Sequence, residues 1–442
     1  MLTSAQKALK TQNCGWPHLV MKPIDSKRNS LLNPNNIPLE LRLLLSCLRA
    51  SLGQDERDRI NTLTRMAIDW DVFIGLVDRH RTSSPAYRSL NRFAANNIPE
   101  SVRNRLRERF QRNAQQVLAK TAELVRIVKR FEQNHIRILP IKGPVVALQA
   151  YGDLGSRHVG DLDIMVSPES VKMAEAVLLQ QGYKRIHPDF DLTQKQHAAY
   201  LSLTHHFGYF CQKRGIKVEL HWRFGSSRYL FPLKFDDFWR DRQRIRLGGV
   251  DMATLSLEHT ILLLCAHGAI HAWSRLFWLN DIACLMKKHG STDWHGLMLH
   301  AARLGSGRMV AEGIVLSNLL LTSPLPEPIR TFSERDKGVE RLVKTALYLI
   351  THHKPEFYSP GTSAYWYSKY NLFILHSDPK YKLGFCLQHM GASSGDWNRF
   401  PLPDALFPIY YLIRPYTWLF RWYIRGTEIY LKKTKDRTND VA

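Results

Sequence analysis

Residues 138–143 read Ile-Leu-Pro-Ile-Lys-Gly, and residues 156–166 read Ser-Arg-His-Val-Gly-Asp-Leu-Asp-Ile-Met-Val. The second stretch has the apolar content of a short strand and carries Asp161 and Asp163 two residues apart. Residues i and i+2 of a strand share a face, so the two carboxylates should project together, roughly 7 Å apart at about 3.3 Å per residue. Neighbouring acids repel each other unless a cation lies between them, and Mg²⁺ binds a few carboxylates while keeping positions for water and phosphate. The spacing therefore predicts metal-assisted phosphoryl chemistry.

The first stretch supplies candidate phosphate-binding residues. Lys142 and Gly143 end a predicted strand at 136–141 and precede a predicted helix at 145–151. Glycine lets a backbone approach a phosphate closely, and a helix N-terminus offers free N–H groups and the positive end of its dipole. Arg157 lies four residues before Asp161. It is expected to reach a triphosphate or to brace Asp161, with a plain salt bridge as the alternative.

A third acid is expected from residues 216–222, Ile-Lys-Val-Glu-Leu-His-Trp, which alternate apolar and polar side chains and form a predicted hairpin with 207–211. Glu219 and His221 would share one face with Lys217. If this strand lies beside the aspartate strand, Glu219 completes a three-carboxylate cluster for one or two divalent ions and could help to deprotonate an acceptor hydroxyl. The alternative is that Glu219 pairs with Lys217 or Arg223 on an exposed edge.

Histidines form a further set of candidates. His205 and His206 precede one predicted strand, whereas His267 and His271 lie four residues apart on one helix face. Such a helical pair binds zinc when a third ligand joins it. We favour the alternative that these histidines line the cleft or satisfy buried polar groups. Asp281, ten residues beyond His271, is placed to orient one of them.

The sequence pattern as a whole predicts an α+β protein. A small mixed β-sheet with flanking helices is expected, preceded and followed by mainly α-helical segments. Helical spacing of apolar residues dominates 39–131 and 255–285, with Pro99 as a break and Ser101 as the expected cap of the next helix. The predicted organisation is a flexible basic segment at 1–36, a helical domain at 37–132, a core with the acids at 133–250, a helical domain packing on the core at 251–330 and an aromatic-rich basic helical region at 331–442.

Composition narrows the class of partner. The 442 residues include 62 Lys plus Arg against 39 Asp plus Glu, a net charge of +23. This excess favours anionic partners such as nucleotides, nucleic acid or an anionic membrane surface, although a basic solubility surface is the alternative. Core packing is the favoured interpretation of the aromatic C-terminal region, ahead of membrane or nucleic-acid contact.

Location is predicted from what the sequence lacks. The six cysteines form no Cys-x-x-Cys pair, which favours a reducing compartment and argues against a structural zinc site. The N-terminus lacks a signal-peptide core and no run of 18 apolar residues occurs, so we expect no transmembrane segment. The prediction is a cytoplasmic protein with peripheral membrane attachment as an option; the oligomeric state is not specified by the sequence.

The ordered set Lys142-Gly143, Arg157, Gly160-Asp161-Leu162-Asp163 and Val218-Glu219-Leu220-His221-Trp222, followed by His267, His271 and Asp281, resembles a known family. It is similar to uncharacterised bacterial nucleotidyltransferases of the DNA-polymerase-β-like superfamily. The resemblance implies transfer of a nucleoside monophosphate from an NTP, with ATP the expected donor, to an unidentified acceptor with Mg²⁺ or Mn²⁺. Asp161, Asp163 and Glu219 would be the catalytic and metal-binding acids, while Lys142, Gly143 and Arg157 would bind the nucleotide. His221, His267, His271 and Asp281 would belong to the cleft.

Lys142-Gly143 stands where the superfamily has a Gly-Ser pair, and Asp161 follows Gly143 by 18 positions, a longer gap than is usual in polymerase-like members. Two rival hypotheses follow. The chain could be a non-catalytic, degenerate module of this fold that binds nucleic acid, a membrane surface or a protein partner. A kinase-like phosphotransferase is disfavoured, because neither a Gly-x-Gly-x-x-Gly loop nor a His-Arg-Asp set is present.

Overall fold

The computed structural model describes residues 37–49, 53–225, 231–352, 363–391, 393–417 and 419. The predicted flexible segment at 1–36 lies outside the described residues, as does most of the chain beyond 417. Residues 38–442 form one compact unit. The predicted boundaries at 132, 250 and 330 therefore remain predictions.

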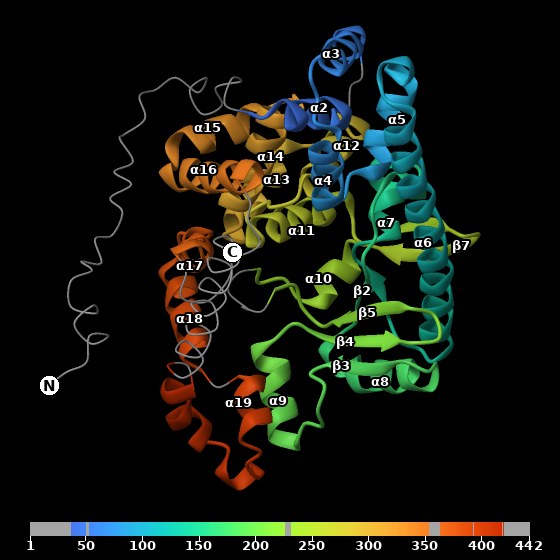
Figure 1. Cartoon of the computed structure of the whole chain (residues 1–442). Coiled ribbons are helices and arrows are strands. Elements are labelled where there is room, and N and C mark those ends of the chain that lie inside the picture. The colour runs from blue at the N-terminus through green and yellow to red at the C-terminus, as the bar shows by residue number, and fades with distance from the viewer. Residues whose placement is uncertain are drawn as a thin grey trace, which may run out of the picture. The chain divides into compact units, whose positions relative to one another are not determined.

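A five-stranded mixed sheet lies at the centre of the acid-bearing segment (Figure 1). Its strands occur in the order β1-β2-β5-β4-β3. Strands β2 and β5 pair in parallel, whereas the other neighbours pair antiparallel. The mixed sheet predicted from the sequence is thus confirmed, with the bounds β1 Leu139–Pro140, β2 Leu162–Met165, β3 Lys184–His187, β4 His206–Cys211 and β5 Ile216–His221.

The residue pattern of the two central strands explains their position. All four residues of β2 are buried, as expected for a strand with neighbours on both sides and helices on the sheet. Strand β5 alternates, with Val218 and Leu220 fully buried and Lys217 and Glu219 partly exposed. The parallel register places Asp163 directly beside Glu219. The apolar residues therefore hold the sheet together while the acids share its opposite face.

The N-terminal helical prediction for 39–131 is confirmed. The long helix α6 contacts α5, α7 and α8, so it links the N-terminal helices to the sheet-bearing segment (Figure 1). It begins at Glu100 with Pro99 as its N-cap, so the expected cap at Ser101 is wrong; the ring of Pro99 fixes the entry into the helix. These helices are α2 Leu39–Leu48, α3 Gln54–Thr64, α4 Trp70–His80, α5 Ser83–Phe93 and α6 Glu100–Gln133, with a 3₁₀ turn at Ala95–Asn97.

Short elements connect the strands. The helix expected at 145–151 is α7 (Pro144–Val146) followed directly by a π-helical turn (Ala147–Tyr151). After β2, a 3₁₀ turn at Pro168–Ser170 leads into α8 (Val171–Gln180), which matches its predicted helix. The remaining elements of this part are a 3₁₀ turn at Leu154–Ser156, α9 Gln194–Leu203, α10 Phe235–Arg240 and a separate hairpin of β6 Gln243–Leu247 and β7 Val250–Thr254.

The C-terminal part of the described chain is helical. Helix α14 contacts α11, α12, α15 and α16, which makes it the centre of this group. No helix in the described ranges has both the length and the apolar character needed to cross a bilayer. The bounds are α11 Leu257–Ile270, α12 Leu276–Lys288, α13 Trp294–Arg303, α14 Gly307–Leu321, α15 Glu327–Arg335, α16 Lys337–His352, α17 Ser363–Ile374, α18 Pro379–Met390 and α19 Ser394–Arg399, with a 3₁₀ turn at Asp404–Leu406 and a helical segment at 409–417.

Candidate functional site

The three predicted acids meet on one face of the sheet, where the central strands β2 and β5 lie side by side. Asp163 and Glu219 are partners in the parallel ladder, and oxygen atoms of both lie within 4.8 Å of a ring nitrogen of His221 and of each other. Asp161, one residue before β2, joins them through Lys217. The Lys217 Nζ atom lies 3.5 Å from Asp161 Oδ2 and 2.6 Å from Glu219 Oε1. Strands β2 and β5 are therefore neighbours, as the predicted cluster of three carboxylates requires.

Cationic side chains balance these carboxylates. The Lys142 Nζ atom lies 2.8 Å from Asp163 Oδ1, and Lys217 bridges the other two acids. The His221 Nε2 atom lies 3.2 Å from Asp163 Oδ1 and 3.5 Å from Glu219 Oε2. Glu219 thus pairs with Lys217 and also lies beside Asp163, although not on an exposed edge; its role as a metal ligand stays a prediction.

The pKa values follow from this arrangement. Burial would raise the pKa of the Asp163 carboxyl, but Lys142 and the hydrogen bond from His221 lower it to about 2. Burial opposes ionisation of Glu219 too, yet His221, with other cationic neighbours, lowers its pKa far below the usual range. Burial, Asp163 and Glu219 raise the pKa of Asp161. At neutral pH, Asp163 and Glu219 are ionised, while Asp161 feels repulsion that another cation would relieve.

Gly143 lies where the chain passes closest to the acids. Its φ of +70° and ψ of −129° belong to a region that is essentially restricted to glycine. A Cβ at this position would lie 3.4 Å from Val159 Cγ1 and 3.6 Å from the Asp161 carbonyl oxygen. The backbone conformation at position 143 therefore requires glycine. The chain at this position packs directly against the segment that carries Asp161.

Arg157 and Asp281 form a buried ion pair. The guanidinium contacts both carboxylate oxygens, with Nε–O distances of 3.0 and 2.9 Å and an Nη2–Oδ2 distance of 2.8 Å. The Tyr151 hydroxyl donates to the same carboxylate at 2.8 Å. The plain salt bridge considered for Arg157 is thus what the structure contains, with Asp281 as the acid. The carboxylate of Asp281 contacts Arg157 and Tyr151 rather than a histidine.

His267 and His271 lie side by side at the end of α11, with ring centroids 4.7 Å apart, and both contact Trp278. Burial and Lys142 lower the pKa of both rings, for His271 to about 4. The three-ligand clusters found among the described residues do not include this pair. The favoured interpretation, in which these histidines line the cleft, agrees with their position.

All predicted site residues except Asp281 line one cavity of about 950 Å³, and Asp281 lies behind Arg157. This volume falls within the usual size of ligand pockets. The candidate histidines His205 and His206 line it too, together with basic and aromatic residues that the sequence did not single out, among them Arg81, Arg275, Phe277 and Trp278. The cavity therefore combines an acidic cluster on the central strands of the sheet with a basic and aromatic wall.

The position of His206 opposite His221 could have been predicted from the sequence. The predicted hairpin turns through four residues, Gln-Lys-Arg-Gly at 212–215, which pairs Cys211 with Ile216 and so brings His206 opposite His221. Arg81 could not have been found in this way, because it follows α4 and reaches the cavity only through long-range packing.

The comparison with known families covers all the predicted site residues, whereas the cavity residues from Ser368 to Arg414 lie beyond the matched range. Residues 66–322 match the model of a family described as uncharacterised nucleotidyltransferase. No curated protein matches the chain significantly. The matched residues make up more than half of the chain and include all three acids, the cavity histidines from His205 to His271 and the Arg157–Asp281 pair.

Proposed function

The chain belongs to the uncharacterised nucleotidyltransferase family, and on that basis we propose that it is a Mg²⁺-dependent nucleotidyltransferase. It moves a nucleoside monophosphate from an NTP, with ATP the expected donor, to a hydroxyl of a small molecule or peptide. The observation that carries this proposal is the parallel pairing of Asp163 with Glu219 at the cavity edge, beside Asp161. A pair of ionised acids facing a basic cavity suits a metal-bound polyphosphate.

The donor set fits a hard cation. Asp161, Asp163 and Glu219 supply carboxylate oxygens, the ligands that Mg²⁺ and Mn²⁺ prefer. A bound Mg²⁺ would supply charge neutralisation for the transferring phosphoryl group. The raised pKa of Asp161, caused by burial and by the two neighbouring acids, supports a site that gains from an added cation.

The basic residues bind and orient the nucleotide. Lys142 and Gly143 line the cavity beside the acids, where Lys142 supplies a positive charge for a phosphate. Arg157 already forms an ion pair with Asp281, so its role is to position this part of the cavity wall. Arg81 is the better phosphate contact, because burial and the nearby Arg275 lower its pKa, and an anion would relieve that repulsion.

Glu219 acts as a cation ligand rather than as a general base. Its low pKa makes the carboxylate a poor proton acceptor, whereas efficient general bases have a pKa near the operating pH. The proton of the acceptor hydroxyl therefore leaves to another acceptor or to water. This modifies the sequence-based expectation that the third acid assists deprotonation.

Substitution of Asp163 tests the proposal. We expect Asp163→Asn to lower the transfer of label from α-labelled ATP by at least about 100-fold, since even outer-shell changes at metal sites cost 10- to 100-fold. Asp251→Asn, an exposed acid on β7, is the matched control and should retain full transfer. Thermal unfolding of both variants checks that the fold is intact, because Asp163 also pairs with Lys142. Undiminished transfer by a folded Asp163→Asn protein would refute the assignment.

The released product separates nucleotidyl transfer from phosphoryl transfer. A nucleotidyltransferase releases pyrophosphate, whereas a kinase releases ADP and moves label from γ-labelled ATP. We expect pyrophosphate only. Release of ADP together with transfer of the γ-label would favour the phosphotransferase hypothesis.

One observation favours a second candidate, the non-catalytic module. The ammonium groups of Lys142 and Lys217 already contact all three carboxylates, so the chain itself offsets most of the negative charge of the cluster. Calorimetry with Mg²⁺ and a non-hydrolysable ATP analogue distinguishes the two candidates. Absence of binding would favour the module. A nucleic-acid partner of such a module would show affinity that falls steeply with salt, because phosphate contacts release counterions.

A further inference from the structure

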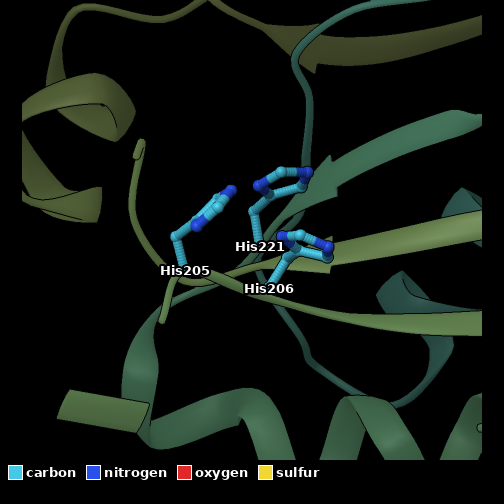
Figure 2. Close-up of side chains that lie close together, drawn as sticks. All are labelled: His205, His206 and His221. Carbon is cyan, nitrogen blue, oxygen red and sulfur yellow. The ribbon is translucent and has the colours of Figure 1, made fainter. Parts of the chain in front are cut away.

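Three histidines converge beside the acidic cluster (Figure 2). His206 at the start of β4 is the ladder partner of His221 at the end of β5. His205 precedes β4, and its carbonyl oxygen accepts a hydrogen bond of 3.1 Å from the Trp222 backbone N–H. One nitrogen from each of the three rings lies within 4.8 Å of the other two. The paired backbone of the hairpin thus holds all three rings in place.

The free ring nitrogens make this cluster more than a packing arrangement. The Nδ1 atoms of His205, His206 and His221 are buried and have no hydrogen-bond partner among the described residues. The Nε2 atoms of two of these rings face carboxylates, for His221 at 3.2 Å from Asp163 and for His206 at 3.9 Å from Glu219. At His221 the carboxylate on Nε2 fixes the tautomer and leaves Nδ1 as a metal ligand, whereas the His206 Nε2 atom lies beyond hydrogen-bond distance of Glu219. A buried unsatisfied nitrogen otherwise costs free energy, which a metal ion would recover.

The spacing of the rings agrees with a tetrahedral site. A Zn–N bond of about 2.0–2.1 Å places the ring centres of neighbouring tetrahedral ligands about 5 Å apart. The ring centroids lie 4.4 Å apart for His205 and His206, 5.1 Å for His206 and His221, and 5.6 Å for His205 and His221. These centroid distances bracket the spacing expected for three histidines on one tetrahedral ion.

We propose that His205, His206 and His221 form a second metal site, which binds Zn²⁺ or a similar transition-metal ion and is distinct from the Mg²⁺ site of the acids. Imidazole nitrogens suit zinc-class metals, whereas Mg²⁺ prefers oxygen ligands. All three histidines line the cavity that holds the acids, so an ion bound by them would be accessible from the space where a ligand would bind. Three histidines with one open position are the ligand set of catalytic rather than structural zinc sites. His221 connects the two sites, because its second nitrogen contacts Asp163.

Cobalt binding tests this site without any need for turnover, so its outcome is independent of the proposed function. The full chain, prepared without an affinity tag and stripped of metal with a chelator, is titrated with Co²⁺ in the presence of millimolar Mg²⁺. We expect one equivalent to bind with the strong visible absorption of tetrahedral cobalt, and Zn²⁺ to displace it. His205→Gln and His206→Gln should each weaken binding by at least about 100-fold, since loss of a ligand exceeds the 10- to 100-fold cost of outer-shell changes.

His271→Gln is the matched control, because His271 lines the same cavity outside the cluster. It should leave the cobalt spectrum unchanged. Thermal unfolding of the metal-free proteins shows whether each variant is folded, and the two single variants on one hairpin give independent measurements. Weak octahedral absorption alone, or loss of binding in the control, would overturn the proposal. So would a spectrum that survives His205→Gln but disappears in Glu219→Gln, since the metal would then lie in the cluster of Asp163, Glu219 and His221.

Discussion

Substitution of Asp281 with Asn should destabilise the protein by several kilocalories per mole. Arg157 is 6% exposed and Asp281 is fully buried, and three nitrogen–oxygen contacts of 2.8–3.0 Å join them. Removing one charge from a buried pair leaves the other uncompensated, which costs about 3–5 kcal/mol. The Tyr151 hydroxyl can still donate to the amide oxygen of Asn. The loss of stability should therefore come mainly from the Arg157 guanidinium, which stays buried without a counter-charge.

Urea denaturation followed by circular dichroism measures this loss as a change in the free energy of unfolding. Asp78→Asn is the matched control, because Asp78 forms a bidentate pair with Arg109 but is half exposed. Exposed pairs contribute about 0–1 kcal/mol, so the control should lose at most about 1 kcal/mol. Replacing both buried partners by apolar residues, as Arg157→Met with Asp281→Leu, should recover much of the loss.

A loss for Asp281→Asn that equals the loss of the control would refute this reasoning. It would mean that Arg157 finds water or another acceptor once Asp281 is neutral. A double variant no more stable than the single variant would show that the pair contributes positioning that apolar packing does not replace.

Three other perturbations have defined outcomes. Burial and nearby cations lower the pKa of His158 to about 3, below its unfolded value of about 6.5, so its contribution to stability is present above pH 6.5 and is lost as the pH falls towards 3. His158→Gln should therefore reduce the dependence of the unfolding free energy on pH, by up to about 1.4 kcal/mol per pH unit between pH 6.5 and pH 4.5. The exposed His295→Gln is the control and should leave this dependence unchanged. Equal slopes in the unsubstituted protein and in both variants would contradict the prediction. Gly143→Ala should lower the free energy of unfolding by about 1–3 kcal/mol in the same urea assay, because φ is positive at this position. Gly75→Ala, inside α4, should instead raise it by up to about 1 kcal/mol. An unchanged stability of Gly143→Ala would show that the backbone relaxes. Lys217→Met removes an ammonium group from Glu219 and should raise Mn²⁺ affinity, measured by electron paramagnetic resonance, up to about fivefold for an interaction of ~1 kcal/mol; weaker binding would show that the lysine supports the metal instead of competing with it.

Local patterns predicted the elements of the site well. The alternation at 216–222 correctly indicated β5, and the hairpin with β4 follows from the four-residue turn. The helix at 171–181 and the short aspartate strand were also recognised from sequence. Each of these depends on neighbours within about 20 residues, where periodicity and turn chemistry are informative.

Two features show where local patterns fail. The parallel pairing of β2 with β5 joins segments more than 50 residues apart. The local pattern did not predict this pairing, and the three-carboxylate cluster could be expected only if the two strands were neighbours. The pairing of Arg157 with Asp281 spans an even longer stretch, so the sequence could suggest a salt bridge without identifying its acid. By contrast, the hairpin of β6 and β7 was predictable but not predicted. Gly248 and Gly249 both have positive φ between two alternating strands, the pattern of a tight two-residue turn.

The parallel contact between β2 and β5 also determines when in synthesis the acidic site can exist. A nascent chain that has emerged only as far as β2 carries Asp161 and Asp163 without the partner strand. The site therefore cannot assemble until residues up to His221 have left the ribosome and the hairpin has docked. Any ligand that requires all three acids binds the completed sheet alone and shifts the equilibrium towards it. Amide protons of the β2–β5 ladder should then exchange more slowly with solvent deuterium when that ligand is present.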